Sequence, residues 1–384
     1  MDAHPNESLD LVLDEPEVVA SAPGRVEFIG NHTDYNGGWV LGATIDRRVE
    51  VEVERRTDRR LRMASGDDVP LVEVGLDQIQ KQTGDRSWAN YVLGTIVALQ
   101  VKGLAVDTGL NLRVRSALPV GAGLSSSAAL ELATAFAVTE LVGGDLNRRT
   151  LAQAGRRAEN DFVGVPCGIL DQAVVAFGAD DRLVRVDART GQVTGVPFPP
   201  DTRLWIFRTH EAHSLADAHY QERFDEARAA RRRLANHLGC LDHLVDVTPA
   251  QLEGARESLP EPLYRRARHV STEHRRVKEA VRRLEEGDVE GVGDLLFESH
   301  ESSRHHYENS TPELDFVVDR LAEIGPVLGA RLTGAGFGGA AMAWTRASFG
   351  RAEAASVQEA YADRFGAELE VMACQPAEGV RVEA

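Results

Sequence analysis

The sequence predicts an α+β fold divided into two domains. Segments with strand character alternate with helical segments but form no regular βαβ crossovers, and this favours α+β over a doubly wound parallel sheet. The 384 residues are enough for two domains of ordinary size, and 43% of them are hydrophobic, so a sizeable core is available. The composition changes near residue 200. We therefore expect domains at residues 1–200 and 201–384.

Strand and helix patterns follow one another in the first half of the chain. Val49, Val51 and Val53 alternate with charged residues, as in a half-buried strand, and we expect the first strand to end at Pro23-Gly24. The apolar segment before Gly103 ends as helices commonly do. Strands are expected at residues 17–23, 38–56, 109–118, 182–187 and 203–209, and helices at residues 88–103, 125–143, 147–164 and 168–178.

The second half is mainly helical up to about residue 321. From residue 214 onward it is rich in Arg and Glu, and breaks are expected near Pro249, Pro260, Gly287 and Pro312. Residues 329–345 predict two strands joined by a glycine turn, followed by a helix at 352–366 and a strand at 368–374. We find no internal repeat and no low-complexity linker.

Charge and composition narrow the class of function. The net charge of −17 argues against a nucleic-acid or anionic-membrane binder, because both need clustered positive charge. The three cysteines form no CxxC pair, which favours a reducing compartment. The N-terminus lacks the pattern of a signal peptide, and no apolar run approaches the ~20 residues that span a bilayer. We expect a cytoplasmic protein that is monomeric and acts on small molecules.

The segment "PVGAGLSSSAAL", from Pro119 to Leu130, predicts a phosphate-binding loop. Glycines let the backbone turn its amide N–H groups inward, and the N-terminus of the following helix adds positive potential at the same place. Three serines add hydroxyl groups. The P-loop lysine is absent, and a glycine turn with a serine N-cap is the simpler alternative. A second segment, "LTGAGFGGAAMA" at 332–343, would allow close approach of backbone to a ligand or to the first loop.

These two loops and the stretch "GRVEFIGNHTDYNGG" at 24–38 together resemble the three motifs of the GHMP small-molecule kinases. The first stretch resembles the signature of the galactokinase family, and the similarity extends to "WANYVLG" at 88–94, "PCGILDQ" at 166–172 and "YENSTPELD" at 307–315. The resemblance covers nearly the whole chain. It implies an N-terminal domain like ribosomal protein S5 domain 2 and a ferredoxin-like C-terminal domain.

The resemblance also implies the chemistry: transfer of the γ-phosphoryl group of ATP to the anomeric hydroxyl of galactose. Asp171 corresponds to the family's catalytic aspartate, which accepts the hydroxyl proton, and Arg25 to the arginine that stabilises the developing charge. For either residue alone, a structural ion pair is an equal alternative. Ser127 and Glu159 correspond to ligands of the Mg²⁺ that accompanies ATP. From its neighbours alone, Glu159 would be placed on a solvated helix face.

Further residues follow from the same resemblance. The expected ATP-binding residues are Ser65, Trp88, Tyr91, Gly121, Ala122, Gly123, Leu124, Ser125, Ser126 and Ser127. The expected sugar-binding residues are Asn31, His32, Thr33, Asp34 and Tyr220. His32 and Asp34 would bond sugar hydroxyls. Without the resemblance, Trp88 and Tyr91 would be assigned to the helix core.

Two departures from the family pattern leave alternatives open. Asn31 stands where galactokinases usually have a glutamate that contacts the primary hydroxyl, and His305-His306 replaces two acids. We expect both histidines on a solvated face, because adjacent residues of a helix point apart. Another pyranose, such as an amino sugar or a pentose, is therefore an alternative substrate. A non-catalytic sugar sensor is disfavoured, because the serine loop is uninterrupted and Arg25 and Asp171 are both present.

Overall fold

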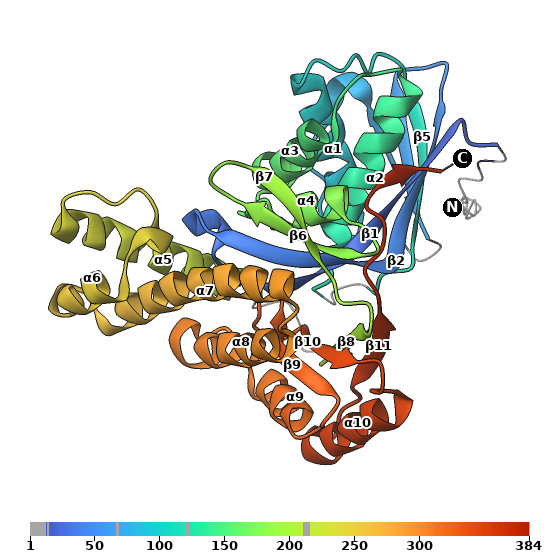
Figure 1. The fold of residues 1–384 in the computed structure, drawn as a ribbon. Coiled ribbons are helices and arrows are strands. Elements are labelled where there is room, and N and C mark those ends of the chain that lie inside the picture. Colours follow the sequence, from blue (N-terminus) through green and yellow to red (C-terminus); the bar gives the residue numbers. More distant parts are fainter. Residues whose placement is uncertain (1–12, 14, 67–68, 120–122, 210–215, 384) are drawn as a thin grey trace, which may run out of the picture.

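The computed structural model describes residue 13 and residues 15–66, 69–119, 123–209 and 216–383. Figure 1 shows two lobes, with a pair of long helices extending from the junction between them as an arm. Among the described residues, every helix is too short or too polar to cross a lipid bilayer. The expected start of the helical region at residue 214 lies outside the described residues.

The first lobe is built on a mixed sheet of eight described strands in the order β12-β1-β2-β5-β3-β4, with β6 and β7 added at β2. Its strands are β1 (Val18–Ile29), β2 (Trp39–Arg55), β3 (Arg60–Ser65), β4 (Val72–Gly75), β5 (Leu110–Ser116), β6 (Arg182–Asp187), β7 (Gln192–Pro197) and β12 (Arg381–Val382). Helices α2 (Ser126–Leu141) and α4 (Leu170–Phe177) pack against the sheet, and α1 (Ala89–Val101) and α3 (Arg148–Arg157) pack on these helices. The pairing of β3 with β5 is parallel, and the other pairings are antiparallel.

The second lobe has a four-stranded antiparallel sheet in the order β11-β8-β10-β9. Its strands are β8 (Thr202–Arg208), β9 (Val327–Thr333), β10 (Ala340–Arg346) and β11 (Glu370–Cys374). The helices after β8 are α5 (Ala216–Leu238), α6 (Pro249–Gly254), α7 (Glu261–Glu286), α8 (Val289–Ser302), α9 (Pro312–Ala322) and α10 (Arg351–Phe365). In Figure 1, α5, α6 and the first part of α7 form the arm, while α9 and α10 cover one face of the sheet.

The chain changes sheet between Pro197 and Thr202, which supports the proposed boundary near residue 200, but β12 returns to pair with β1 in the first lobe. Both faces of the second sheet are buried. Alternate residues of each strand point to opposite sides, so they enter two different apolar clusters. Leu204 and Ile206 join the apolar cluster that continues into the first lobe, whereas Trp205 and Phe207 face α9 and α10.

Most expected elements are confirmed, including the breaks near Pro249, Gly287 and Pro312, where helices begin or end. One strand boundary was wrong. The first strand does not end at Pro23-Gly24 but continues to Ile29, with a register shift at Gly24. A proline and a glycine are tolerated there because the strand bulges. The expected helix at 147–164 is a short α-helix followed by a π-helical segment, Ala158–Val163.

Candidate active site

A cavity lies between the two lobes, and five segments of the chain meet there. They are the end of β1 with the turn after it, the end of the serine loop, residues 159–171, the start of α5, and the glycine loop between β9 and β10. The described residues that line it are Arg25, Glu27, Asn31, His32, Asp34, Tyr35, Gly123, Glu159, Val165, Pro166, Cys167, Gly168, Leu170, Asp171, Tyr220, Thr333, Gly334, Ala335, Gly336, Gly338 and Gly339. Eight of the sequence-predicted site residues are therefore brought together: Arg25, Asn31, His32, Asp34, Gly123, Glu159, Asp171 and Tyr220.

Arg25 and Asp171 form a bidentate ion pair on the cavity wall. Arg25 Nε donates to Asp171 Oδ1 at 2.8 Å, and Nη2 donates to Oδ2 at 2.7 Å. The Ser125 hydroxyl donates to the same Oδ2. The Arg25 side chain is nearly buried, whereas 26% of the Asp171 side chain remains exposed. The carboxylate is thus fixed in orientation while it still faces the cavity.

Gly24 allows the approach that places Arg25. A side chain at Gly24 would lie 2.5 Å from Leu118 Cδ2 and 2.9 Å from the Leu124 carbonyl oxygen. With glycine there, Arg25 N donates to the Leu124 carbonyl at 3.0 Å, and Arg25 Nη1 donates to the Gly123 carbonyl at 2.7 Å. The bulge in β1 therefore joins the first motif directly to the serine loop.

The serine loop leads into the N-terminus of α2, as expected. Ser125 occupies the N-cap position with a φ of 55°, but its hydroxyl bonds Asp171 and makes no cap hydrogen bond. A left-handed serine is strained and needs support from its surroundings. This geometry favours the functional interpretation over a simple capped turn. Gly121 and Ala122 lie outside the described residues.

The second glycine loop lies against the first. A Cβ built on Gly334 would be 3.2 Å from the Gly123 carbonyl oxygen, so this position tolerates little more than glycine. The expected close approach between the two loops is confirmed. This contact between the loops places the ends of β9 and β10 of the second lobe at the edge of the cavity.

Glu159 is buried beside the serine loop, and the solvated alternative is wrong. The π-helical segment after α3 carries it inward, where it is 7% exposed. Gln172 Nε2 donates to Glu159 Oε2 at 2.7 Å. Burial raises the pKa of Glu159 and nearby Asp171 raises it further, whereas the Ser127 hydroxyl lies close enough to Glu159 to lower its pKa. An acid in this position would be stabilised as a carboxylate by a cation.

Asp34 lines the same cavity as Asp171 and lies in a tight space. A Cβ on Gly168 would lie 1.5 Å from Asp34 Oδ2, so only glycine fits beside this carboxylate. Burial raises the pKa of Asp34, the backbone N–H of Tyr35 lowers it, and the charge of Asp171 raises it again. Tyr220 of α5 lines the same cavity, and its ring centroid lies 5.5 Å from that of His32.

His32 lines the cavity, but both ring nitrogens already have protein partners. Nε2 lies 3.2 Å from the Ala335 carbonyl oxygen and Nδ1 lies 2.8 Å from the Tyr35 hydroxyl, so Nε2 carries the proton and Nδ1 accepts. The ring stacks on Tyr307 at 4.3 Å. Burial lowers the pKa of His32 to about 3, so the ring is neutral. These contacts compete with the expected hydrogen bonds to sugar hydroxyls.

Asn31 is buried with its side-chain amide engaged on both ends. Nδ2 donates to the Gly334 carbonyl at 2.8 Å, and Oδ1 accepts from Asn309 Nδ2 at 2.7 Å. Asn309 Nδ2 also lies 3.0 Å from the Ala335 carbonyl oxygen. Asn31 thus connects the sugar motif to the glycine loop, with one N–H and one oxygen lone pair left for a ligand.

Eight expected binding residues within the described ranges do not line this cavity: Thr33, Ser65, Trp88, Tyr91, Leu124, Ser125, Ser126 and Ser127. The hydroxyl of Thr33, which is fully buried, lies 2.8 Å from the Gly30 carbonyl oxygen and 2.7 Å from that of Trp39, so it holds the turn and not a sugar. Ser65 ends β3, while Trp88 and Tyr91 pack against the main apolar core. Their assignment to an ATP pocket stays a prediction.

His305 and His306 lie in a second π-helical segment, Ser303–Tyr307. His305 is exposed, as expected, with Nε2 3.1 Å from Glu301 Oε2, whereas His306 is half-buried. Within the described part of the chain, no group of three or more His, Cys, Asp or Glu side chains is arranged to hold a metal ion.

Sequence reasoning missed several polar residues around the cavity. They are Glu27, which lines it, and Asn309, His269 and Glu273, which hold its walls. A usable signal existed for two of them: His269 and Glu273 are spaced by four residues in a helix, together with Arg266 three residues earlier.

Comparison with known families agrees with this geometry. The galactokinase galactose-binding signature matches residues 12–55, the GHMP kinases N terminal domain matches residues 90–179, and the GHMP kinases C terminal domain matches residues 277–367. These matches confirm the predicted two-domain GHMP kinase fold of the α+β class.

The similarity extends over whole chains. The galactokinase of Roseiflexus sp. (strain RS-1) is 39% identical over 365 residues, which cover 95% of this chain and 93% of that protein. The galactokinase of Thermococcus kodakarensis is also 39% identical, covering 94% of this chain and 99% of that protein. The crystal structure of Lactococcus lactis galactokinase complexed with galactose is 33% identical, with a TM-score of 0.91 and coverage of 95% and 94%. The chain belongs to the galactokinase family of GHMP kinases.

Proposed function

We propose that this protein transfers the γ-phosphoryl group of ATP to the anomeric hydroxyl of galactose, with Asp171 as the base. The observation that carries the proposal is the Arg25–Asp171 pair, which faces a cavity between the sugar motif and the serine loop. A fixed carboxylate beside a loop suited to phosphate is the arrangement that phosphoryl transfer to a hydroxyl requires. The family membership supports the same reaction and the same two substrates.

The hydrogen bonds of Asp171 indicate which oxygen accepts the proton. Oδ2 accepts from Arg25 Nη2 and from Ser125, so both of its lone pairs are used. Oδ1 accepts only from Arg25 Nε and keeps one lone pair toward the cavity. We infer that the anomeric hydroxyl donates to Oδ1. The Arg25 guanidinium then stabilises the negative charge that develops on the attacking oxygen.

Ser127 and Glu159 fit a Mg²⁺ ion bound with ATP. Both offer hard oxygen ligands, the two side chains lie near each other, and Glu159 sits in a buried position that favours a cation partner. When bound there, the ion would neutralise phosphate charge. The N-terminus of α2 adds positive potential beside the same oxygens, because Ser126 and Ser127 form its first turn.

For the sugar, we assign direct contacts to Asp34, Tyr220 and the free N–H of Asn31. His32 and Thr33 shape the turn instead, because their polar atoms are used within the protein.

A pyranose altered at the primary hydroxyl is the second candidate substrate, because the neutral Asn31 stands in place of the family's usual glutamate. A neutral hydrogen bond contributes about 0.5–1.5 kcal/mol, against about 1.5–3 kcal/mol for one to a charged group. We expect less than about a 10-fold drop in kcat/KM for 6-deoxygalactose.

An assay of ADP formation across galactose, 6-deoxygalactose, arabinose, galactosamine and glucose tests the proposal. We expect the highest kcat/KM with galactose and phosphate at the anomeric position of the product. ADP formation with none of these sugars would overturn the proposed function, and a higher kcat/KM with another pyranose would replace galactose. We also propose that the protein is monomeric and cytoplasmic. Sedimentation equilibrium tests the monomeric state.

A further inference from the structure

Helix α7 carries a stripe of buried polar side chains on the face that packs toward the cavity. Arg266, His269 and Glu273 are spaced by three and four residues, so they lie on one side of the helix. Each is at most 2% exposed. Buried charged and polar groups are costly unless they are paired, so each member of this stripe needs a partner.

Glu273 has its partners in the sugar motif. Its Oε1 accepts from the backbone N–H of Gly30 at 3.0 Å and from that of Asn31 at 3.3 Å. The Ser299 hydroxyl of α8 donates to the same oxygen at 2.6 Å. Arg276, one turn further along α7, donates to Oε2 at 2.8 Å. One carboxylate of the second lobe therefore holds two consecutive backbone amides of the first.

The charge of Glu273 is balanced within the interior. Arg331, which is fully buried, donates to Ser299 Oγ at 3.1 Å and pairs with Glu27 at 3.0 Å. Burial alone would raise the pKa of Glu273, but Arg276, His269 and Arg331 outweigh it and lower the pKa to about 2. Glu273 is therefore ionised, and its hydrogen bonds to the loop are charge-assisted ones.

His269 holds the same loop from the next turn of α7. Its Nε2 donates to the Asn31 carbonyl at 3.1 Å, and its Nδ1 lies 3.0 Å from the Ser302 hydroxyl. Asn31 thus has its N–H and its carbonyl bound by two residues of one helix.

The loop needs this support because its backbone is strained. Gly30 has a φ of 120°, and His32 has a φ of 60°, which is unfavourable for a residue with a side chain. Such conformations cost energy and persist only where the surrounding structure holds them. Asn31 lies between Gly30, whose φ only glycine adopts readily, and the strained His32, and Glu273 and His269 bind its backbone.

We propose that Glu273 is a positioning residue for sugar binding: it holds the Gly30–Asn31 backbone, and so Asn31 and the turn that carries Asp34, in the shape that binds the sugar. The role is specific to the sugar. Arg25, Asp171 and the serine loop are held by hydrogen bonds among themselves, and Glu273 makes none of these. Loss of the Glu273 carboxylate should therefore weaken sugar binding and leave ATP binding unchanged.

The test compares Glu273→Gln and Glu273→Ala with Glu279→Gln. Glu279 is on the same helix and is also paired with arginines, but it lies on the surface. For each protein we would measure the KM for galactose, the KM for ATP, galactose affinity by calorimetry, and Tm. We expect the KM and Kd for galactose to rise about 10-fold in Glu273→Gln and about 100-fold in Glu273→Ala. The KM for ATP should stay within about twofold, and Glu279→Gln should match wild type.

Two results would overturn the proposal. One is a normal galactose affinity in Glu273→Gln despite a lowered Tm, which would leave only a structural role. The other is an equal rise in both KM values, which would indicate general damage. Glu273→Gln keeps an oxygen acceptor and the side-chain shape, so it decides the question if Glu273→Ala does not fold. The inference rests on the proposed sugar substrate, but wild-type turnover in the same assay reports on that function separately.

Discussion

At the scale of single residues, the Asp171 carboxylate is the best-defined part of the site. Three donated hydrogen bonds, two from Arg25 and one from Ser125, fix its plane and leave Oδ1 open. The pattern "GILDQ" predicted a functional aspartate by family resemblance, and Arg25 was predicted beside it. Their contact joins residues 146 positions apart in the chain, so their geometry could not be derived from spacing.

We expect Asp171→Asn to lose most turnover while keeping galactose binding. The amide is a poor proton acceptor, and a positioned base contributes roughly 10²–10⁴-fold in rate. Steady-state kinetics and calorimetric galactose binding measure the two effects. Asp161→Asn, an exposed residue paired with Arg157 nearby, is the control and should keep wild-type rates. Near-normal turnover of Asp171→Asn would remove this residue from the mechanism.

Ser127→Ala and Glu159→Gln should raise the Mg²⁺ concentration needed for half-maximal rate and lower kcat, with little change in galactose affinity. Their oxygens lie on the serine-loop side of the cavity, where ATP and its ion are expected. Magnesium titrations at saturating galactose provide the measurement. If both variants keep the wild-type magnesium dependence, the ligand assignment is wrong.

Asn31→Asp tests the amide at the sugar end of the cavity. The substitution keeps the shape but turns the group that donates to the Gly334 carbonyl into an acceptor facing an acceptor. A buried polar group left without its partner costs about 1–3 kcal/mol, so we expect the KM for galactose to rise about 10-fold or more. Asn147→Asp is the control, because either residue caps a helix N-terminus equally well. An unchanged KM would mean that Asn31 does not shape the sugar site.

The same contacts show what the sequence could not reveal about residues. His32 and Thr33 were expected to bind sugar, but their polar atoms bond the protein's own backbone and Tyr35. Whether a polar atom is free depends on partners distant in sequence, here the Ala335 carbonyl that accepts from His32. A motif therefore predicts that a residue is near the site more reliably than it predicts which atom meets the ligand.

At the scale of elements, hydrophobic periodicity and glycine or proline positions predicted most helices and strands, because these are local properties. The errors occurred where tertiary contacts prevail. The first strand continues through Pro23-Gly24 because Gly24 packs against Leu118 and Leu124. Helix α7 has the amphipathic composition of a surface helix, yet its buried polar stripe lies behind the sugar motif.

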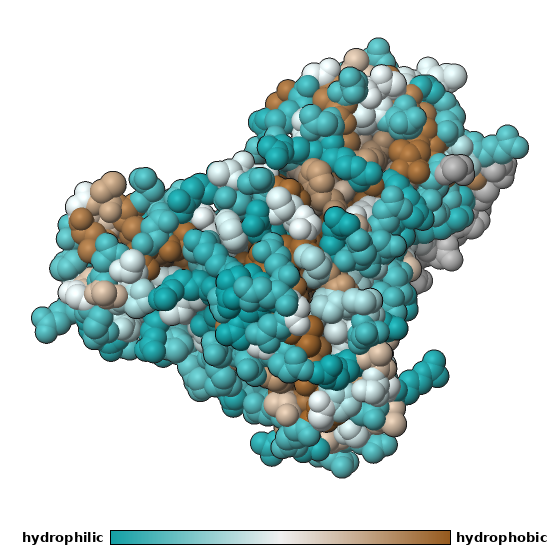
Figure 2. All heavy atoms as spheres, viewed as in Figure 1, coloured by the Kyte–Doolittle hydropathy of each residue, from teal (hydrophilic) through white to brown (hydrophobic). Residues whose placement is uncertain are grey.

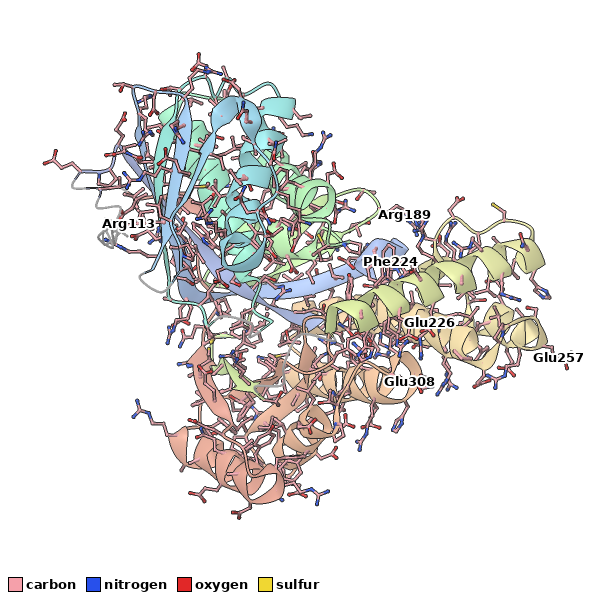
Figure 3. All side chains as sticks on the ribbon, turned by 180° about the vertical axis from the view of Figure 1, so that it is seen from behind. Arg113, Arg189, Phe224, Glu226, Glu257 and Glu308 are labelled. Atoms are coloured by element: carbon pink, nitrogen blue, oxygen red, sulfur yellow. The ribbon has the colours of Figure 1, made fainter. Side chains whose placement is uncertain are left out.

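The packing of the arm explains why that stripe is polar. Arg266 bonds Glu226 of α5 and Glu308, and Figure 3 shows these two glutamates close to the junction of the arm with the lobes. Glu308 has a φ of 56° and precedes Asn309, which holds Asn31. One helix thus positions α5, which carries Tyr220, and the sugar motif together.

A pH dependence of stability should follow from His269. Burial lowers its folded-state pKa to about 4, against 6.5 for an ordinary histidine, so its contribution is present above pH 6.5 and is lost as the pH falls toward 4. His269→Gln should reduce the free energy of unfolding at pH 7.5. That reduction should shrink by about 2 kcal/mol at pH 5, because each pKa unit corresponds to about 1.36 kcal/mol.

Urea denaturation followed by circular dichroism at the two pH values measures this difference. His237→Gln, at an exposed position near the end of α5, is the control and should change stability little at either pH. A reduction in His269→Gln that is the same at both pH values would contradict the buried, neutral state of this histidine.

At the scale of the whole molecule, one apolar cluster continues through both lobes. Phe28 of β1 and Trp344 of β10 meet within it, with ring centroids 5.5 Å apart in an edge-to-face arrangement. The space-filling view shows a mostly hydrophilic surface over this core, with hydrophobic residues visible on the first lobe, between the lobes and at the end of the arm (Figure 2). Because β1 leads directly into the sugar motif, the packing between the lobes also bears on the shape of the site.

Trp344→Ala should therefore affect both stability and sugar binding. Trp344 is fully buried, and truncating such a side chain costs about 3–5 kcal/mol. Loss of the contact with Phe28 removes support from the end of β1, so the KM for galactose should rise several-fold.

Trp205→Ala is the matched control. Trp205 lies on the next strand of the same sheet and packs edge-to-face on Phe349 at 5.1 Å, but on the face away from the first lobe. We expect it to lose comparable stability and to keep the wild-type KM. Urea denaturation and kinetics below the unfolding transition separate the two effects. If both variants raise the KM equally, the lobes are not coupled to the site through this contact, and the loss reflects general loosening of the second lobe.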